Sequence, residues 1–229
     1  ALMLFEIILK DHPDHIDSLY LASVSSRYLK NFDDSRKYIE RLLLNAPDMG
    51  RAYQELGHIN RDMGNEEKAV IHYRQACELN PALLASWNAL YSYFVKNKNQ
   101  PAADHARQQL DKLQSLPASL LYIDQILNEG RLGLAETKCR AFLQKNPTHT
   151  YAMSLLSEIA NRLGYFDDAE FLLEKAVEFE PKDGDLRMQY AVILRKKQKF
   201  TKTMEQVNIL CDQYPDNLVY QAQKASEIM

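Results

Sequence analysis

The chain has 229 residues, and its 28 lysines and arginines nearly balance its 31 aspartates and glutamates, giving a formal net charge of −3 at pH 7. A charge so close to zero produces no strong positive field, which argues against nucleic acid as a partner. No stretch is long and apolar enough to span a membrane. The three cysteines, Cys77, Cys139 and Cys211, are far apart and form no Cys-x-x-Cys motif. They therefore predict core thiols in a reducing, cytoplasmic setting rather than a disulfide framework.

Prolines mark a repeat along the whole chain. Pro13, Pro47 and Pro81 follow one another at intervals of 34 residues, and a second proline series with the same interval begins at Pro147. Between Pro81 and Pro147 the register changes once, because two repeats are together two residues short. A period of this length is typical of solenoid proteins. It predicts a single array with units at 16–49, 50–83, 84–115, 116–149, 150–183 and 184–217, flanked by partial units at 1–15 and 218–229.

Both ends of the chain fall inside a repeat. Ala1, Phe5 and Ile8 already occupy the apolar stripe of a second helix, and residues 218–229 stop partway through a first helix. Solenoids normally end in polar capping elements. We therefore expect a fragment of a longer protein, whose uncapped ends also offer a route to homo-oligomers.

Unit 50–83 is the most regular copy and predicts two antiparallel helices. Gly64 can take a positive φ and end the first helix. Gly57 and Ala69 are small, which predicts a close approach of the two helices where a larger side chain would force them apart. Pro81 ends the second helix, because proline has no backbone N–H and restricts the residue before it.

The order of aromatic, small and helix-breaking residues in this unit resembles the tetratricopeptide repeat (TPR). Unit 150–183 keeps the same phase, with Leu156, Gly164, Phe166, Ala169, Ala176 and Pro181. The resemblance covers essentially the whole chain. It implies an all-α TPR solenoid, a right-handed superhelix of antiparallel helix pairs, that serves as a non-catalytic scaffold for a protein or peptide.

The middle of the chain departs from the pattern. In unit 84–115, Lys98 stands in place of the turn glycine and the terminal proline is absent. Pro117 opens the next unit, whose first helix has more apolar residues than one stripe needs. We expect a local change in the pitch of the superhelix here, caused either by irregular packing or by a functional asymmetry.

In TPR arrays the first helices line a concave groove, and the resemblance assigns specific positions of each unit to it. The candidate ligand-groove residues are Tyr20, Arg27, Gln54, His58, Arg61, Asn88, Ser92, Lys96, Leu120, Leu127, Tyr151, Glu158, Arg162 and Arg195.

Two features of this set suggest a ligand. A row of cations near the ends of the first helices comprises Arg27, Arg61, Lys96, Arg162, Arg195 and Lys196. It predicts either an acidic peptide as partner or solvated side chains that complement helix C-termini. Leu120 and Leu127 predict either an apolar patch in the groove or packing at the irregular junction.

No motif for catalysis, metal or cofactor binding is present. The six histidines form no His-Glu-x-x-His, and there is neither a Gly-rich strand-to-helix loop nor a Gly-x-Ser-x-Gly. We expect no catalytic residue, no metal site and no cofactor in these 229 residues.

Segments 130–136, 167–174 and 194–200 resemble repeats that precede the catalytic domain of bacterial TPR-containing sulfotransferases. This resemblance covers about the last hundred residues. It implies an alternative function, in which the chain is the N-terminal, substrate-recruiting arm of a multidomain enzyme whose catalytic domain lies elsewhere. No catalytic residue carries over, because the loop that would bind a sulfate-donor nucleotide is absent.

Overall fold

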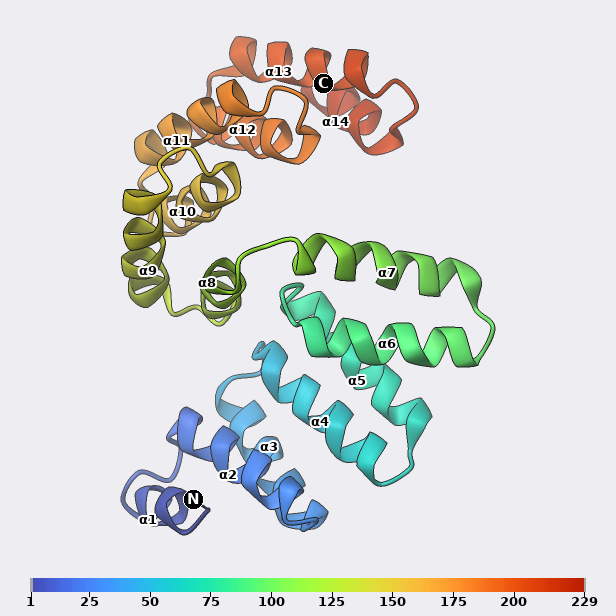
Figure 1. Cartoon of the computed structure of the whole chain (residues 1–229). Helices are drawn as coiled ribbons and strands as arrows, with labels where there is room; N and C mark the ends of the chain where they lie inside the picture. The colour runs from blue at the N-terminus through green and yellow to red at the C-terminus, as the bar shows by residue number, and fades with distance from the viewer. Residues whose placement is uncertain (1, 229) are drawn as a thin grey trace. The chain divides into compact units, whose positions relative to one another are not determined.

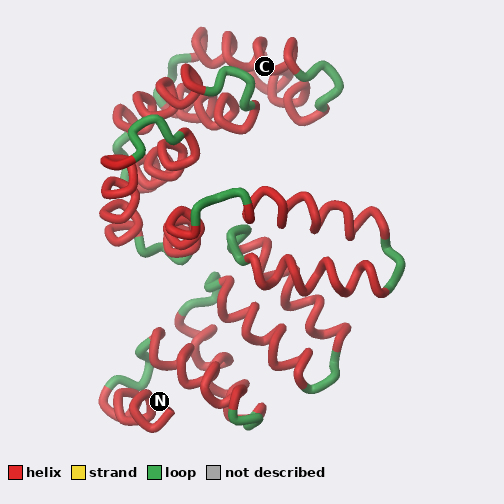
Figure 2. The backbone as a smooth tube through the Cα atoms, in the orientation of Figure 1, coloured by secondary structure: helices red, strands yellow, loops and turns green. Residues whose placement is uncertain are grey.

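The computed structural model describes residues 2–228, so Ala1 and Met229 of the flanking partial units lie outside the described residues. Its described residues form fourteen α-helices joined by short loops, without a strand (Figure 2). The prediction of an all-α fold is therefore confirmed. The chain divides into two compact units, Ala1–Gly130 and Arg131–Met229, which are described separately as unit 1 and unit 2.

Unit 1 contains the first eight helices (Figure 1). They are α1 (Leu2–Asp11), α2 (Ile16–Tyr28), α3 (Phe32–Asn45), α4 (Gly50–Asp62), α5 (Glu66–Leu79), α6 (Leu84–Lys96), α7 (Gln100–Gln114) and α8 (Ala118–Asn128). Helices α2 and α3, α4 and α5, and α6 and α7 pack as hairpins, and α3 packs on α4 and α5 on α6. Three predicted repeat units are thus stacked in order.

Unit 2 contains the remaining six helices. They are α9 (Leu132–Lys145), α10 (Thr150–Arg162), α11 (Phe166–Phe179), α12 (Gly184–Lys196), α13 (Phe200–Gln213) and α14 (Leu218–Ile228). The hairpins α10–α11 and α12–α13 coincide with the predicted units 150–183 and 184–217. The predicted hairpin of repeat 116–149 is divided between the two compact units, because α8 belongs to unit 1 and α9 to unit 2.

Two residues after the end of each of the first helices α2, α4, α6, α8, α10 and α12, the backbone has a positive φ. The residues at these positions are Lys30, Gly64, Lys98, Gly130, Gly164 and Gln198, with φ between 54° and 81°. In the turn at Gly64, the Asn65 N–H donates back to the Asn60 carbonyl, six residues counted inclusively, which is a Schellman closure. Lys98 has φ 54° and its neighbour Asn99 makes the same bond to Phe94. Lys98 thus adopts the positive φ that glycine has at the corresponding position of other repeats.

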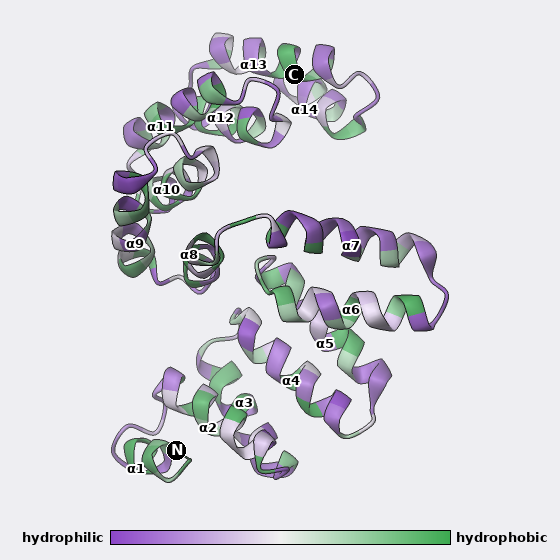
Figure 3. Cartoon of the chain, viewed as in Figure 1, coloured by the Kyte–Doolittle hydropathy of each residue, from purple (hydrophilic) through white to green (hydrophobic). Residues whose placement is uncertain are grey.

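The core of each hairpin depends on matched small and large residues. A Cβ atom added at Gly57 would lie 2.5 Å from Cε1 of Tyr73, so the close approach predicted at Gly57 is confirmed. Ala69 and Tyr73 are both buried in this hairpin. Figure 3 shows that the helices carry hydrophobic and hydrophilic residues together, as expected of helices that bury one face.

The three cysteines are free and buried, as predicted for core residues. Burial raises the pKa of the Cys77 and Cys139 thiols to about 12, which keeps them protonated and unreactive. Among the described residues, no helix combines the length and the apolar character needed to cross a membrane.

Candidate functional site

A cavity of about 510 Å³ opens between α4 and α6, with α5 as its floor; we call it the α4–α6 cavity. It is lined by His58, Arg61, Glu66, Ala69, Val70, Tyr73, Ala85, Asn88, Ala89, Ser92, Tyr93 and Lys96. Five of the fourteen predicted groove residues are brought together here, namely His58, Arg61, Asn88, Ser92 and Lys96. The first helices thus do line a hollow in this part of the chain.

The sequence reasoning missed the residues that give the cavity its size. Ala85 and Ala89 leave space on the α6 wall, and Ala69 leaves space on α5. Tyr93 supplies aromatic surface, whereas Tyr73 borders the cavity but is only 2 % exposed. A signal was present in the sequence, because two alanines four residues apart on α6 lie on one helix face.

His58 and Tyr73 form a neutral pair at the floor of the cavity. The His58 Nδ1 and the Tyr73 hydroxyl are 2.7 Å apart, and the rings meet edge to face with centroids 5.3 Å apart. Burial lowers the pKa of His58 to about 4, and the nearby Arg61 and Arg27 contribute to this lowering. Burial raises the pKa of Tyr73 to about 12. Both side chains are therefore uncharged near neutral pH.

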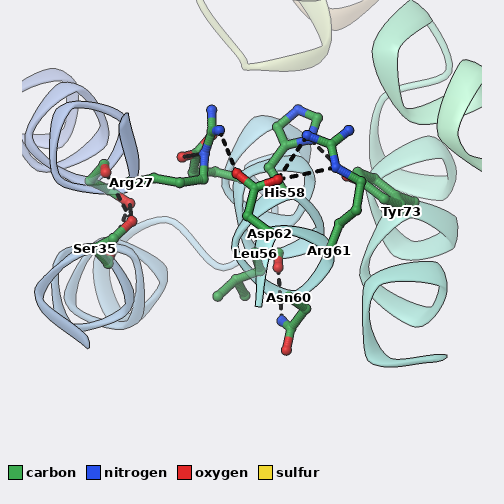
Figure 4. A network of polar contacts seen from close by, with 10 residues as sticks. Arg27, Ser35, Leu56, His58, Asn60, Arg61, Asp62 and Tyr73 are labelled. Carbon is green, nitrogen blue, oxygen red and sulfur yellow. Dashed lines mark hydrogen bonds and ion pairs between the residues drawn. The ribbon is translucent and has the colours of Figure 1, made fainter. Parts of the chain in front are cut away.

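An ion network connects α2 with α4 beside this pair. Arg27 Nε lies 2.6 Å from Glu55 Oε1, and Arg27 Nη1 lies 3.0 Å from Asp62 Oδ2. Figure 4 shows that Arg27 reaches Asp62 from one side while Arg61 approaches it from the other. Burial raises the pKa of Asp62, but hydrogen bonds and charge from both arginines outweigh it, so the pKa is below its usual value. Asp62 thus holds Arg61 at the mouth of the cavity.

Five of the six cations in the predicted row pair with carboxylates of the chain, and the sixth, Lys196, donates to an amide oxygen. Arg27 is only 9 % exposed and is bound by two carboxylates. Lys96 pairs with Glu66 at 2.7 Å, and Arg61 pairs with Asp62 at 3.1 Å. In unit 2 the partners are Glu158 for Arg162, Glu227 for Arg195 and the side-chain carbonyl oxygen of Asn161 for Lys196. An acidic partner stays a prediction, but it cannot rest on an excess of unpaired positive charge.

The predicted apolar groove patch at Leu120 and Leu127 is wrong. Their exposed fractions are 0 % and 2 %, so neither offers surface to a ligand. The alternative reading, packing at the irregular junction, fits their burial. Helix α8 is bonded to the rest of unit 1, since Asn80 Nδ2 donates to the Gln125 carbonyl at 3.2 Å and Gln125 Nε2 donates to the Ala82 carbonyl at 3.1 Å.

The remaining predicted residues lie outside the α4–α6 cavity. Arg51 is stacked over the Tyr20 ring, with Cζ 4.8 Å from the ring centroid, and it also pairs with Glu129 after α8. Gln54 Oε1 accepts a hydrogen bond from Ser86 Oγ at 3.0 Å. Tyr151 is half-buried in α10.

Unit 2 has a cavity at the corresponding place, 100 residues further along the chain. Its volume is about 130 Å³, and it is lined by Ser157, Glu158, Asn161, Leu173, Met188, Gln189, Val192 and Ile193. On the second wall, Met188, Gln189, Val192 and Ile193 replace Asn88, Ala89, Ser92 and Tyr93, and the first three are larger than the residues they replace. Larger side chains therefore fill in unit 2 the space that unit 1 leaves open.

Among the described residues, no group of three or more histidine, cysteine, aspartate or glutamate side chains is arranged to hold a metal ion.

A protein-family model matches two of the repeats. Residues 50–83 and 151–183, which are the hairpins α4–α5 and α10–α11, match the family model described as tetratricopeptide repeat. Together with the stacked hairpins, this match identifies the fold as an all-α TPR solenoid. No curated protein sequence matches the chain significantly.

Several solved structures are similar to the chain at low sequence identity. YrrB, described as a TPR protein with an unusual peptide-binding site, is 15% identical over 82% of this chain and 97% of its own, with a TM-score of 0.42. TTC0263, a thermophilic TPR protein in Thermus thermophilus, is 18% identical over 93% and 98%, with a TM-score of 0.41. PilW, a type IV pilus biogenesis factor, is 17% identical over 90% and 97%, also with a TM-score of 0.41.

Proposed function

We propose that the chain is a non-catalytic scaffold that binds an extended segment of a protein or peptide in the α4–α6 cavity. The observation that carries this proposal is the cavity itself, about 510 Å³ between two first helices, with walls kept open by Ala85 and Ala89. Its size falls in the range of ligand pockets that are mostly apolar with a few fixed polar groups.

The lining favours a bulky apolar side chain as the anchor of the bound segment. Ala85, Ala89 and Tyr93 offer apolar and aromatic surface, while polar groups such as Asn88 and Ser92 lie on α6 beside them. The charged groups at the mouth are paired within the chain. Recognition therefore rests on shape and apolar burial more than on net charge.

Selection of peptides from a displayed random library tests this proposal. Selected peptides are titrated against the wild type and against the double variant Ala89→Gln/Ser92→Val, which gives unit 1 the residues that narrow the cavity of unit 2. We expect at least a tenfold loss of affinity, about 1.4 kcal/mol, because the anchor side chain loses its space.

The matched control is the reverse exchange, Gln189→Ala/Val192→Ser, which alters unit 2 alone and should leave the affinity of the same peptides unchanged. Peptides that bind the filled variant as tightly as the wild type would show that the α4–α6 cavity is not the binding site.

The narrower predictions go beyond what supports this proposal. A cytoplasmic location, the formation of homo-oligomers and a role as the substrate-recruiting arm of a bacterial sulfotransferase stay predictions. Attachment to a catalytic domain is compatible with peptide binding in unit 1, since a scaffold and a recruiting arm use the same kind of surface.

A further inference from the structure

A second pocket of unit 1, the Trp87 pocket, lies on the face of α6 opposite the α4–α6 cavity. On α6, residues 87, 90 and 94 share one face of the helix, whereas residues 85, 88 and 92 share the other. The pocket has a volume of about 310 Å³. It is lined by Arg74, Cys77, Glu78, Trp87, Leu90, Phe94, Ala102 and His105.

The lining is apolar below and polar at the mouth. Cys77, Leu90 and Phe94 are buried and form the floor. Trp87 and His105 meet edge to face, with ring centroids 5.7 Å apart. At the rim, Arg74 lies over the Phe94 ring at 5.2 Å from its centroid. Three rings thus surround one apolar hollow.

At the corresponding position of unit 2, a buried arginine replaces the tryptophan. Trp87 Nε1 donates to the Pro81 carbonyl at 2.9 Å, and Arg187, 100 residues later, donates through Nη2 to the Pro181 carbonyl at 2.8 Å. Arg187 is buried, and its Nη1 donates to Gln206 Oε1 at 2.6 Å.

Unit 1 has Ala106 where unit 2 has Gln206, so an arginine at position 87 would lack this hydrogen-bond partner. The repeat therefore folds with either tryptophan or arginine at this position, so the fold does not require the tryptophan of unit 1.

The geometry points to the Trp87 pocket as a second binding site, which takes an aromatic side chain presented by a partner protein. Aromatic rings pack favourably edge to face or offset against other rings, as Trp87 and Phe94 would allow. Pockets for free small molecules bury most of the ligand surface. This pocket is open at a mouth flanked by the exposed Arg74, Glu78 and His105, which suits one ring anchored on a larger partner.

Trp87 is the only tryptophan of the chain, so its fluorescence reports directly on the pocket. The full chain is titrated with N-acetyl-phenylalanine amide, which represents one aromatic side chain and does not absorb where tryptophan is excited selectively. We expect a saturable change in Trp87 emission. Ala102→Leu fills the pocket and should weaken the apparent affinity at least about tenfold.

Gln108→Leu is the matched control, because it adds the same side chain at an exposed position of α7 outside the pocket lining. It should leave the titration unchanged. If Ala102→Leu fails to fold, Ala102→Lys takes its place, since unit 2 has Lys202 at the corresponding position.

Three results would overturn the inference. They are an emission that does not respond to the probe, a titration curve in the filled variant equal to that of the wild type, and saturation by N-acetyl-leucine amide at the same concentration. The last result would assign the pocket to aliphatic side chains instead.

Discussion

The packing of Gly57 against Tyr73 can be tested by exchanging both residues for those that unit 2 has at the corresponding positions. A Cβ atom at position 57 would lie 2.5 Å from Cε1 and 2.6 Å from Cδ1 of the tyrosine ring, closer than atoms in real proteins approach. In unit 2 the pair is Ser157 and Leu173, and Ser157 Oγ donates to the Ala169 carbonyl at 3.2 Å. Because the side chain of Leu173 is smaller than a tyrosine ring, it leaves room for the serine at position 157.

The structure sets the expected magnitudes. Gly57→Ser alone should destabilise the protein by about 1–3 kcal/mol, because the buried ring has to move. Tyr73→Leu alone should cost about 2–4 kcal/mol through the lost ring volume and the lost hydrogen bond to His58. In the double variant the serine meets leucine instead of the ring. The double variant should therefore lose about 1–2 kcal/mol less stability than the sum of the losses in the two single variants.

Urea denaturation of the wild type, both single variants and the double variant, followed by circular dichroism, gives the four free energies of unfolding. Gly133→Ser is the control, because an added Cβ there meets nothing within 4 Å. It should change the free energy of unfolding by less than about 0.5 kcal/mol. Free energies of the two single variants that add to within about 0.5 kcal/mol would refute the argument from close packing.

The turns and the cavity allow three further predictions. Lys98→Gly and Gln198→Gly should each stabilise the protein by about 0.5–1 kcal/mol, and Gly64→Ala should destabilise it by about 1 kcal/mol, seen as opposite shifts of the melting temperature. Because burial lowers the pKa of His58 to about 4, this histidine is protonated less readily in the folded protein than in the unfolded protein. The unfolded state binds more protons, so stability should fall by roughly 3 kcal/mol from pH 7 to pH 4, and His58→Gln should reduce this slope in pH-dependent unfolding. Titrations of a selected peptide from about 50 to 500 mM salt should change its affinity less than about threefold, since the charges at the cavity mouth are internally paired.

Periodicity carried most of the information about the fold. The spacing of the prolines placed five helical hairpins in their correct residue ranges, and Gly64 and Gly164 located two turns directly. At Lys30, Lys98 and Gln198 the residue type does not mark the turn, and only the phase of the repeat does. Phase succeeds there because the backbone closure of each turn depends on helix geometry more than on the side chain.

The candidate site was less accessible from the sequence, because its chemistry depends on pairs formed across neighbouring repeats. The sequence does not indicate that Arg27 is paired, because its partners Glu55 and Asp62 are 28 and 35 residues away in the chain. Such pairing follows from side-chain reach between stacked helices, which periodicity does not specify. Leu120 was placed in the groove for a related reason, since the repeat phase did not indicate that α8 packs at an irregular junction.

Tyr73 takes part both in the packing of its hairpin and in the α4–α6 cavity. Its ring requires the glycine at position 57, its hydroxyl is hydrogen-bonded to His58, and the buried side chain borders the cavity. Unit 2 has Leu173 at this position, a smaller cavity, and Glu158 in place of the histidine. The change at this core position thus accompanies changes at position 58 and on the second wall, which alter both the charge and the volume of the cavity. The hairpins can keep a common fold while their cavities differ in volume and lining, because Tyr73 and Leu173 are each packed against a matching residue, Gly57 and Ser157.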